Sequence, residues 1–218
     1  MSPSVNHRAG ALAVLCAMSL MIVLDSTIVA VAIPDIQRDL GFSAAGVTWV
    51  VTAYLVAFAG LLLLAGRLGD LLGVRRVFLT GLVVFTAASL LCGFAPTAEL
   101  LVAGRFAQGA GGALAAALVL GMIVRLFPEP RGQARAMGIY SFTQAGGAAA
   151  GFVVGGVLTD AVGWPAIFLI NVPIGVLVWV AGRRVLPRET GLGLGHGLDI
   201  SGALLITGGL SLGVYAIV

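Results

Sequence analysis

Charged residues are scarce in this sequence. Only 10% of its 218 residues are Asp, Glu, Lys or Arg, whereas 60% belong to the hydrophobic group. Soluble domains carry about 25% charged residues, so a soluble protein of this composition would have too few polar residues to cover its surface. Disordered chains combine low hydrophobicity with high net charge, and the net charge here is only +3. The composition therefore predicts an integral membrane protein.

Motifs of catalytic and metal-binding proteins are also lacking. The sequence contains no phosphate-binding loop of the Walker type, no CxxC pair and no HExxH motif. Its two cysteines, Cys16 and Cys92, both lie in apolar runs, which favours small hydrophobic residues over a disulfide or metal pair. His7 and His196 fall outside the apolar runs. We expect no enzymatic activity, no metal and no cofactor, and there is no basic domain that would bind nucleic acid.

Seven apolar stretches are long enough to cross a bilayer, because a helix of about 20 apolar residues spans the hydrocarbon core. They comprise residues 9–33, 47–66, 77–95, 100–124, 136–159, 161–182 and 200–218. The sequence thus predicts an all-α membrane protein with four parts. These are a cytoplasmic N-terminal tail (1–8), a six-helix bundle (9–182), a Gly-rich cytoplasmic linker (183–199) and a seventh transmembrane helix (200–218).

Arginine supplies all 12 basic residues, and its distribution predicts the orientation in the membrane. One side of the predicted spans carries ten arginines: Arg8, Arg67, Arg75, Arg76, Arg125, Arg131, Arg135, Arg183, Arg184 and Arg188. The connections on the other side carry Arg38 alone. Because cytoplasmic loops are enriched in basic residues, we predict a multi-pass protein of the cell membrane with a cytoplasmic N-terminus.

A faint internal repeat divides the bundle into two triplets of helices. The second predicted helix ends in Gly66-Arg-Leu-Gly-Asp70 and the fifth ends in Gly156-Val-Leu-Thr-Asp160, which share the pattern G-x-L-x-D. Since three helices are an odd number, the second triplet has inverted topology. Inverted repeats are typical of secondary transporters.

Two charged residues lie well inside the predicted spans. Asp25 lies in the first span and Arg105 in the fourth, and Gln108 follows one turn after Arg105. A charge at the membrane centre costs at least about 2.5–3.5 kcal/mol and usually marks a functional site. We predict that these three residues take part in proton coupling or substrate binding. The alternatives are a carboxylate bonded to a neighbour near a helix end and an arginine that extends to the membrane surface.

The connection after the second predicted helix combines glycine, acid and base. It contains Gly66, Asp70, Gly73, Arg75 and Arg76. This pattern predicts a tight cytoplasmic turn, in which Asp70 caps a helix or pairs with an arginine of a neighbouring loop.

The fifth predicted helix is rich in glycine. It carries Gly138, Gly147, Gly151, Gly155 and Gly156. Gly147, Gly151 and Gly155 recur every four residues and so share one face, which predicts close packing against another helix. Phe152 is one step round the helix, where we expect it to contact lipid or a cavity wall.

These segments resemble the major facilitator superfamily, and within it the fourteen-span drug:proton antiporters. Residues 24–34 are similar to the first-helix motif LDxTIVNVALP, 66–76 to the loop signature GxLaDrxGrr, 105–113 to the fourth-helix RxxQGxgaA, and 138–156 to the antiporter signature of the fifth helix. Leu71 and Phe152 depart from these patterns, in which a basic residue and a proline are usual.

The resemblance implies the N-terminal six-helix bundle of this fold, a 3+3 inverted repeat, and proton-coupled multidrug efflux. By resemblance, Asp25 and Arg105 serve proton coupling and substrate contact, while Asp70, Arg75 and Arg76 gate the cytoplasmic side. The implied partners are the lipid bilayer, a drug-like small molecule, protons and a C-terminal half, so the chain is expected to be truncated. The alternatives are a facilitator or symporter for another small solute and a non-transporting membrane fragment.

Overall fold

The computed structural model describes residues 5–188, 191–193, 202, 205–206, 208–209 and 212–213. Its helices are α1 Val5–Leu40, η1 Gly46–Thr48, α2 Trp49–Leu72, α3 Val74–Gly93, α4 Ala98–Leu126, α5 Pro130–Val162, α6 Pro165–Leu169 and α7 Asn171–Val185. Within the described residues, six helical segments are long and apolar enough to cross a membrane, with α6 and α7 counted together. The predicted all-α fold with six spans is confirmed. The seventh span, at residues 200–218, lies largely outside the described residues and stays a prediction.

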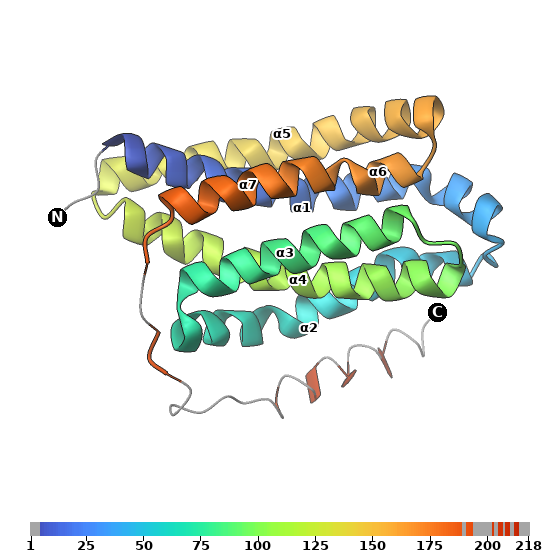
Figure 1. The fold of residues 1–218 in the computed structure, drawn as a ribbon, viewed down its shortest axis with the longest axis horizontal. Helices are drawn as coiled ribbons and strands as arrows, with labels where there is room; N and C mark the ends of the chain where they lie inside the picture. The colour runs from blue at the N-terminus through green and yellow to red at the C-terminus, as the bar shows by residue number, and fades with distance from the viewer. Residues whose placement is uncertain are drawn as a thin grey trace.

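The six segments form two groups of three (Figure 1). Helix α4 packs against α2 and α3, whereas α1 packs against α5, and α7 contacts both α1 and α3. The first helix of each predicted triplet therefore packs against the middle helix of the other triplet. This exchange is the arrangement that two inverted repeats produce when they share one bundle.

Glycines allow the backbones of α2, α3 and α4 to approach closely. A Cβ atom added at Gly109 of α4 would lie 2.3 Å from the carbonyl oxygen of Tyr54 on α2. A Cβ at Gly111, on the other side of α4, would lie 2.4 Å from the backbone nitrogen of Phe85 on α3. Small residues at such crossings are the usual means by which membrane helices associate.

The glycine stripe of α5 faces α1. Gly147, Gly151 and Gly155 are buried, and added Cβ atoms would meet Leu20, Thr27 and Ile28 of α1 respectively. Phe152 is 56% exposed, as its position beside the stripe predicts. A Cβ at Gly138 or Gly156 would meet no described atom within 4 Å, so neither glycine packs against another helix of this bundle, and a packing role for them stays a prediction. They lie outside the four-residue spacing and so occupy other faces of the helix.

The sixth span is interrupted, although the sequence predicted one helix over residues 161–182. Helix α5 continues to Val162 and ends at Gly163, whose φ of +101° favours glycine. A second break at Ile170 separates α6 from α7. Pro173 explains it, because proline cannot donate to the carbonyl four residues earlier and its ring crowds that carbonyl. The break leaves Asn171 as the first residue of α7.

The helix connections fall at two opposite ends of the bundle (Figure 1). The start of α1, the α2–α3 and α4–α5 connections and the end of α7 share one end, which carries the ten clustered arginines. We call it the arginine-rich end; Arg38 lies at the other. Helix α1 already begins at Val5, so part of the expected tail is helical. Part of the expected linker docks at this end, because Leu192 and Gly193 donate backbone hydrogen bonds to the carbonyls of Asp70 and Leu71.

The apolar core is divided into two clusters by a layer of polar side chains. One cluster includes Met21 of α1 and Phe85 of α3, and the other includes Ile28 and Cys92 of the same helices. Between them lie five buried polar residues, here called the polar layer: Asp25, Ser89, Arg105, Gln108 and Asn171. Burying polar groups is costly unless they bond one another, so this layer is the first place to look for function.

Candidate functional site

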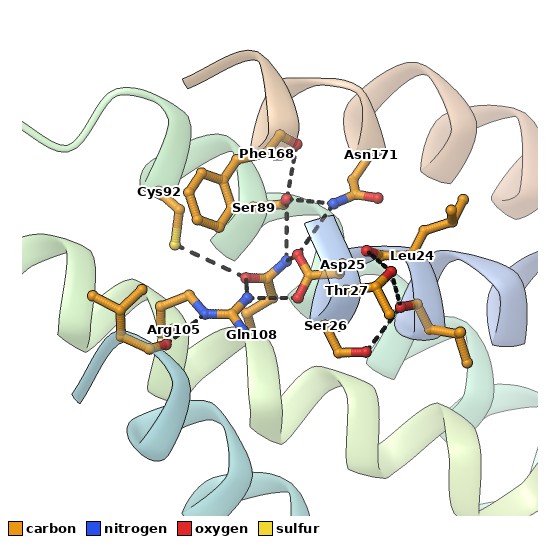
Figure 2. Close-up of polar contacts among 12 residues, drawn as sticks. Leu24, Asp25, Ser26, Thr27, Ser89, Cys92, Arg105, Gln108, Phe168 and Asn171 are labelled. Carbon is orange, nitrogen blue, oxygen red and sulfur yellow. Dashed lines mark hydrogen bonds and ion pairs between the residues drawn. The ribbon is translucent and has the colours of Figure 1, made fainter. Parts of the chain in front are cut away.

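Asp25 and Arg105 form an ion pair inside the bundle (Figure 2). Asp25 lies near the middle of α1, and Arg105 lies two turns after the start of α4, where the two helices contact each other. The Nη1 group of Arg105 donates to Oδ2 of Asp25 at 2.5 Å, and the two side chains are 1% and 0% exposed. Removing one member of such a pair leaves an uncompensated buried charge, which costs about 3–5 kcal/mol.

Gln108 closes a triangle with this pair. Its Nε2 group donates to Oδ1 of Asp25 at 2.7 Å, and its Oε1 atom accepts from Nη1 of Arg105 at 2.6 Å. Arg105 and Gln108 share one face of α4 because they are three residues apart. The three residues predicted from the sequence as a coupling or substrate site are thus in direct contact, and both carboxylate oxygens of Asp25 have a donor.

Helix α2 fixes the guanidinium group of Arg105 from the opposite side. The Nε group donates to the backbone carbonyl of Val50 at 2.9 Å, and the ring of Tyr54 lies 4.4 Å from the guanidinium carbon. Phe168 of α6 lies 5.8 Å away on another side. A desolvated contact between a cation and an aromatic ring contributes about 2 kcal/mol. Arg105 is therefore held by α1, α2 and α6 together.

Two members of the polar layer were not predicted from the sequence. Asn171 of α7 donates to Ser89 Oγ at 3.0 Å and to Oδ1 of Asp25 at 3.4 Å. Ser89 of α3 accepts from Gln108 at 3.2 Å and donates to the carbonyl of Phe168 at 2.9 Å. Asn171 is the one side-chain amide in the sixth predicted span, which is a signal that could have found it. Ser89 has no such signal, since two threonines precede it in the same apolar run.

The chemistry of this layer rests on a difference between its two charged groups. Arginine keeps its proton at every physiological pH, whereas a carboxylate can accept one. Because the Asp25 side chain is fully buried, a proton or a ligand reaches it only after the helices that enclose it have moved. Separation of α1 from α4 would expose the carboxylate and break its bond to Arg105 at the same time. The geometry therefore makes access to the Asp25 carboxylate depend on helix movement.

The loop residues of the 66–76 segment lie far from this layer. Gly73 has a φ of +96° and forms the single-residue connection between α2 and α3. Helix α3 begins without a side-chain cap, so Asp70 does not cap it, and none of the ion pairs among the described residues includes Asp70. Tyr54 and Asp70 are 16 residues apart on α2, which corresponds to about 24 Å along the axis.

Arg75 connects two helices at the arginine-rich end. Its Nη2 group donates to the carbonyl oxygen of Arg183 in the last turn of α7. Carbonyl groups in the last turn of a helix lack partners within the helix, so a cation there is favourable. Gly66 and Arg76 are not buried.

Comparison with known proteins identifies the family. Residues 15–212 match the Major Facilitator Superfamily. The chain belongs to this superfamily. With six membrane-length helices among its described residues, this superfamily member is a multi-pass membrane protein.

Curated relatives in the superfamily have names that refer to antibiotics. The puromycin resistance protein pur8 of Streptomyces alboniger is 44% identical over 96% of this chain and 42% of its own length. The cephamycin export protein CmcT of Amycolatopsis lactamdurans is 44% identical over 93% of this chain and 42% of its own length. The methylenomycin A resistance protein of Bacillus subtilis is 41% identical over 79% of this chain and 37% of its own length. The chain thus spans about two fifths of the relatives it matches.

A solved structure has the same fold. The chain is similar, with a TM-score of 0.74, to a bacterial homologue of the human lysosomal transporter Spinster in an inward-facing, unoccupied conformation. The match covers 91% of this chain and 47% of the other, at 19% sequence identity. Together with the six helical segments, this likeness confirms the predicted six-helix bundle of the major facilitator fold.

Proposed function

We propose that this chain forms the N-terminal half of a proton-coupled multidrug exporter, in which drug leaves the cell as protons enter. Family membership supports transport rather than catalysis. The names of the relatives support an antibiotic or similar drug-like molecule as the cargo. Because those relatives are more than twice as long as this chain, a second bundle is the proposed partner of this one.

The observation that carries the proposal is the sealed Asp25–Arg105–Gln108 triangle. In the conformation described here, Asp25 is paired with Arg105. When the bundle changes conformation, α1 and α4 separate, water reaches Asp25 and the carboxylate accepts a proton. Each proton that enters releases about 2.3 kcal/mol per 100 mV of membrane potential, which can drive the export of drug.

This mechanism assigns different roles to the triangle and to the drug site. A substrate cannot contact a side chain with 0% exposure, so contact between drug and Asp25 also requires movement of the helices. We propose that Asp25 and Arg105 serve mainly to couple proton entry to drug export, and that Gln108 fixes the positions of both side chains. Asp70, Arg75 and Arg76 are proposed to gate the cytoplasmic side, and the bond from Arg75 to the end of α7 supports a part in holding that side closed.

The orientation is also a proposal. We place the arginine-rich end in the cytoplasm, because basic residues are retained on that side of a cell membrane. The ten-to-one distribution of arginine between the two ends supports this orientation.

The test compares two carboxylates of α1 in the protein that is expressed from the complete gene. Asp25→Asn removes the buried partner of Arg105, and Asp35→Asn removes the partner of Arg38 in a half-exposed pair on the same helix. Proton movement driven by puromycin is measured in inverted membrane vesicles with a pH-sensitive dye, at matched protein levels. We expect Asp25→Asn and Arg105→Ala to abolish the signal and Asp35→Asn to retain it. Retention of the wild-type signal by Asp25→Asn at normal expression would refute the coupling role.

A further inference from the structure

A basic cavity of about 800 Å³ opens between α3 and α7 at the arginine-rich end. The two helices lie side by side there (Figure 1). Four arginines line the cavity, namely Arg75 and Arg76 of α3, Arg183 of α7 and Arg188 just beyond it, together with Trp179 and Thr80. Among the described residues that line it, no side chain is acidic. The cavity therefore carries a strong positive potential at the edge of the membrane-spanning region.

The arginines of this cavity are not neutralised by acids of the described part of the chain. The described residues form three ion pairs, and none of them includes one of the four cavity arginines. Arg75 donates through Nη2 to the Arg183 carbonyl, but its Nε atom is buried and has no hydrogen-bond partner in the described residues. Arg183 and Arg188 repel Arg75 as like charges. A buried donor without a partner and three closely spaced cations are features of an anion-binding site.

An apolar groove continues from the basic cavity along α3 and α7, toward the opposite end of the two helices. It has a volume of about 380 Å³ and shares Val83 and Trp179 with the cavity. Beyond them it is lined almost entirely by apolar side chains of α3 and α7, such as Leu90 and Val176. The small residues Ala87 and Gly175 form part of its wall. Charge at one end and hydrocarbon at the other together match an amphipathic ligand.

We propose that the cavity and the groove bind one anionic phospholipid, with its phosphate among the four arginines and an acyl chain along the groove. Guanidinium groups bind phosphate oxygens in bidentate fashion, and basic pockets between transmembrane helices bind acidic lipid headgroups. Trp179 lies where the two regions meet, and tryptophan is enriched at this depth of a bilayer. The leaflet is cytoplasmic in the proposed orientation, but lipid binding does not depend on the proposed transport activity.

Such a lipid would connect α3 to α7. Arg76 and Arg188 are exposed and come from opposite sides of the cavity, so a phosphate bonded to both joins the two helices. Arg75 already links the same helices through the carbonyl of Arg183. Bound lipid thus strengthens a contact at the end where the loop of residues 66–76 lies, and the loop is relieved of repulsion among its arginines.

The test uses brominated lipids, which quench tryptophan on contact. The purified protein in neutral detergent is titrated with dibrominated phosphatidylglycerol or with phosphatidylcholine that has the same chains. Quenching that disappears in Trp179→Phe reports on this site. We expect half-quenching by phosphatidylglycerol at a concentration about tenfold lower than by phosphatidylcholine, since each arginine near an anionic surface adds binding energy.

Each test variant is compared with a control variant that changes the net charge or the side-chain volume by the same amount. Arg76→Gln/Arg188→Gln should abolish the preference for phosphatidylglycerol, whereas Arg131→Gln/Arg135→Gln, which removes two exposed arginines of α5, should retain it. Ala87→Phe fills the groove and should weaken quenching by both lipids, while Ala149→Phe on the exposed surface of α5 should not.

Equal binding of the two lipids, or an unchanged preference in Arg76→Gln/Arg188→Gln, overturns the proposal. Full displacement of phosphatidylglycerol by inorganic phosphate also overturns it, in favour of a free-phosphate site. If the complete wild-type protein preferred phosphatidylglycerol but did not transport puromycin, this result would contradict the proposed function alone.

Discussion

Asp25 and Arg105 lie 80 residues apart in the sequence, yet their side chains meet at 2.5 Å in the polar layer. Each lies on the first helix of its triplet, so the bond joins equivalent helices of the two repeats. The pair is buried, bonded on every side to Gln108, Val50 and Asn171, and enclosed by apolar clusters toward both ends. A contact of this kind stabilises one arrangement of the repeats, and its loss permits another.

The first prediction is that the two charges depend on each other for stability. Asp25→Asn or Arg105→Met alone should destabilise the protein by about 3–5 kcal/mol, because each leaves the other charge buried without a counterion. The double variant Asp25→Asn/Arg105→Met should lose less than the sum of the two, since no uncompensated charge remains. Thermal unfolding in detergent measures all three against wild type.

The ion pair of Asp35 with Arg38 provides the control. It lies on the same helix, but Arg38 is 72% exposed and Asp35 is 34% exposed. Exposed pairs contribute about 0–1 kcal/mol, so Asp35→Asn should unfold almost as wild type does. Strictly additive losses at Asp25 and Arg105 would show that the two residues act independently.

The sequence was sufficient to predict the six spans that the structure describes and the charged residues of the site. Long apolar runs and two isolated charges are local features, and lipid leaves helix as the structure available to them. Ser89 could not be predicted, because Thr80 and Thr86 give the same hydroxyl signal on the same helix. The break at Ile170 could have been inferred from Pro173, but many transmembrane helices continue through proline, as α1 does at Pro34. Partners across helices depend on packing, which a single sequence does not display.

The second prediction distinguishes two hydroxyl groups one turn apart on α3. Ser89 bridges Gln108, Asn171 and the carbonyl of Phe168, whereas Thr86 donates to the carbonyl of Leu82 on its own helix. Ser89→Ala removes a donor from the Phe168 carbonyl next to the helix break, which should cost about 1–3 kcal/mol. Thr86→Ala should cost about 0.5 kcal/mol or less, because Leu82 keeps its helical bond. Melting temperatures of the two variants provide the comparison; equal losses would rule out a special role for Ser89.

The third prediction concerns orientation and uses thiol labelling. The native cysteines, Cys16 and Cys92, are 7% and 0% exposed, so they should not react with a membrane-impermeant maleimide. Ala44→Cys introduces an exposed thiol between α1 and α2, and Arg131→Cys introduces one at the arginine-rich end. In intact cells we expect labelling of Ala44→Cys only, with Arg131→Cys reacting after permeabilisation. The reverse pattern would place the arginine-rich end outside.

The last prediction tests the contact between α1 and α5 with two glycines of the same helix. A Cβ at Gly151 would lie 1.8 Å from the Thr27 hydroxyl and 2.9 Å from its Cβ, whereas a Cβ at Gly156 meets nothing within 4 Å. Gly151→Leu must therefore separate the helices, and overpacking of this kind costs about 1–3 kcal/mol.

Gly156→Leu should be neutral or slightly stabilising in this bundle, since leucine favours helix over glycine by close to 1 kcal/mol. Phe152→Leu should be silent for stability because Phe152 projects away from α1 at 56% exposure. Thr27→Ala removes the hydroxyl with which the Cβ atom of Gly151→Ala would clash. The double variant Thr27→Ala/Gly151→Ala should therefore recover part of the stability that Gly151→Ala loses. Membrane yield and melting temperature are measured for all variants together. If Gly151→Leu matched wild type while Gly156→Leu unfolded, the face of α5 that packs on α1 would have to be the one that carries Gly156.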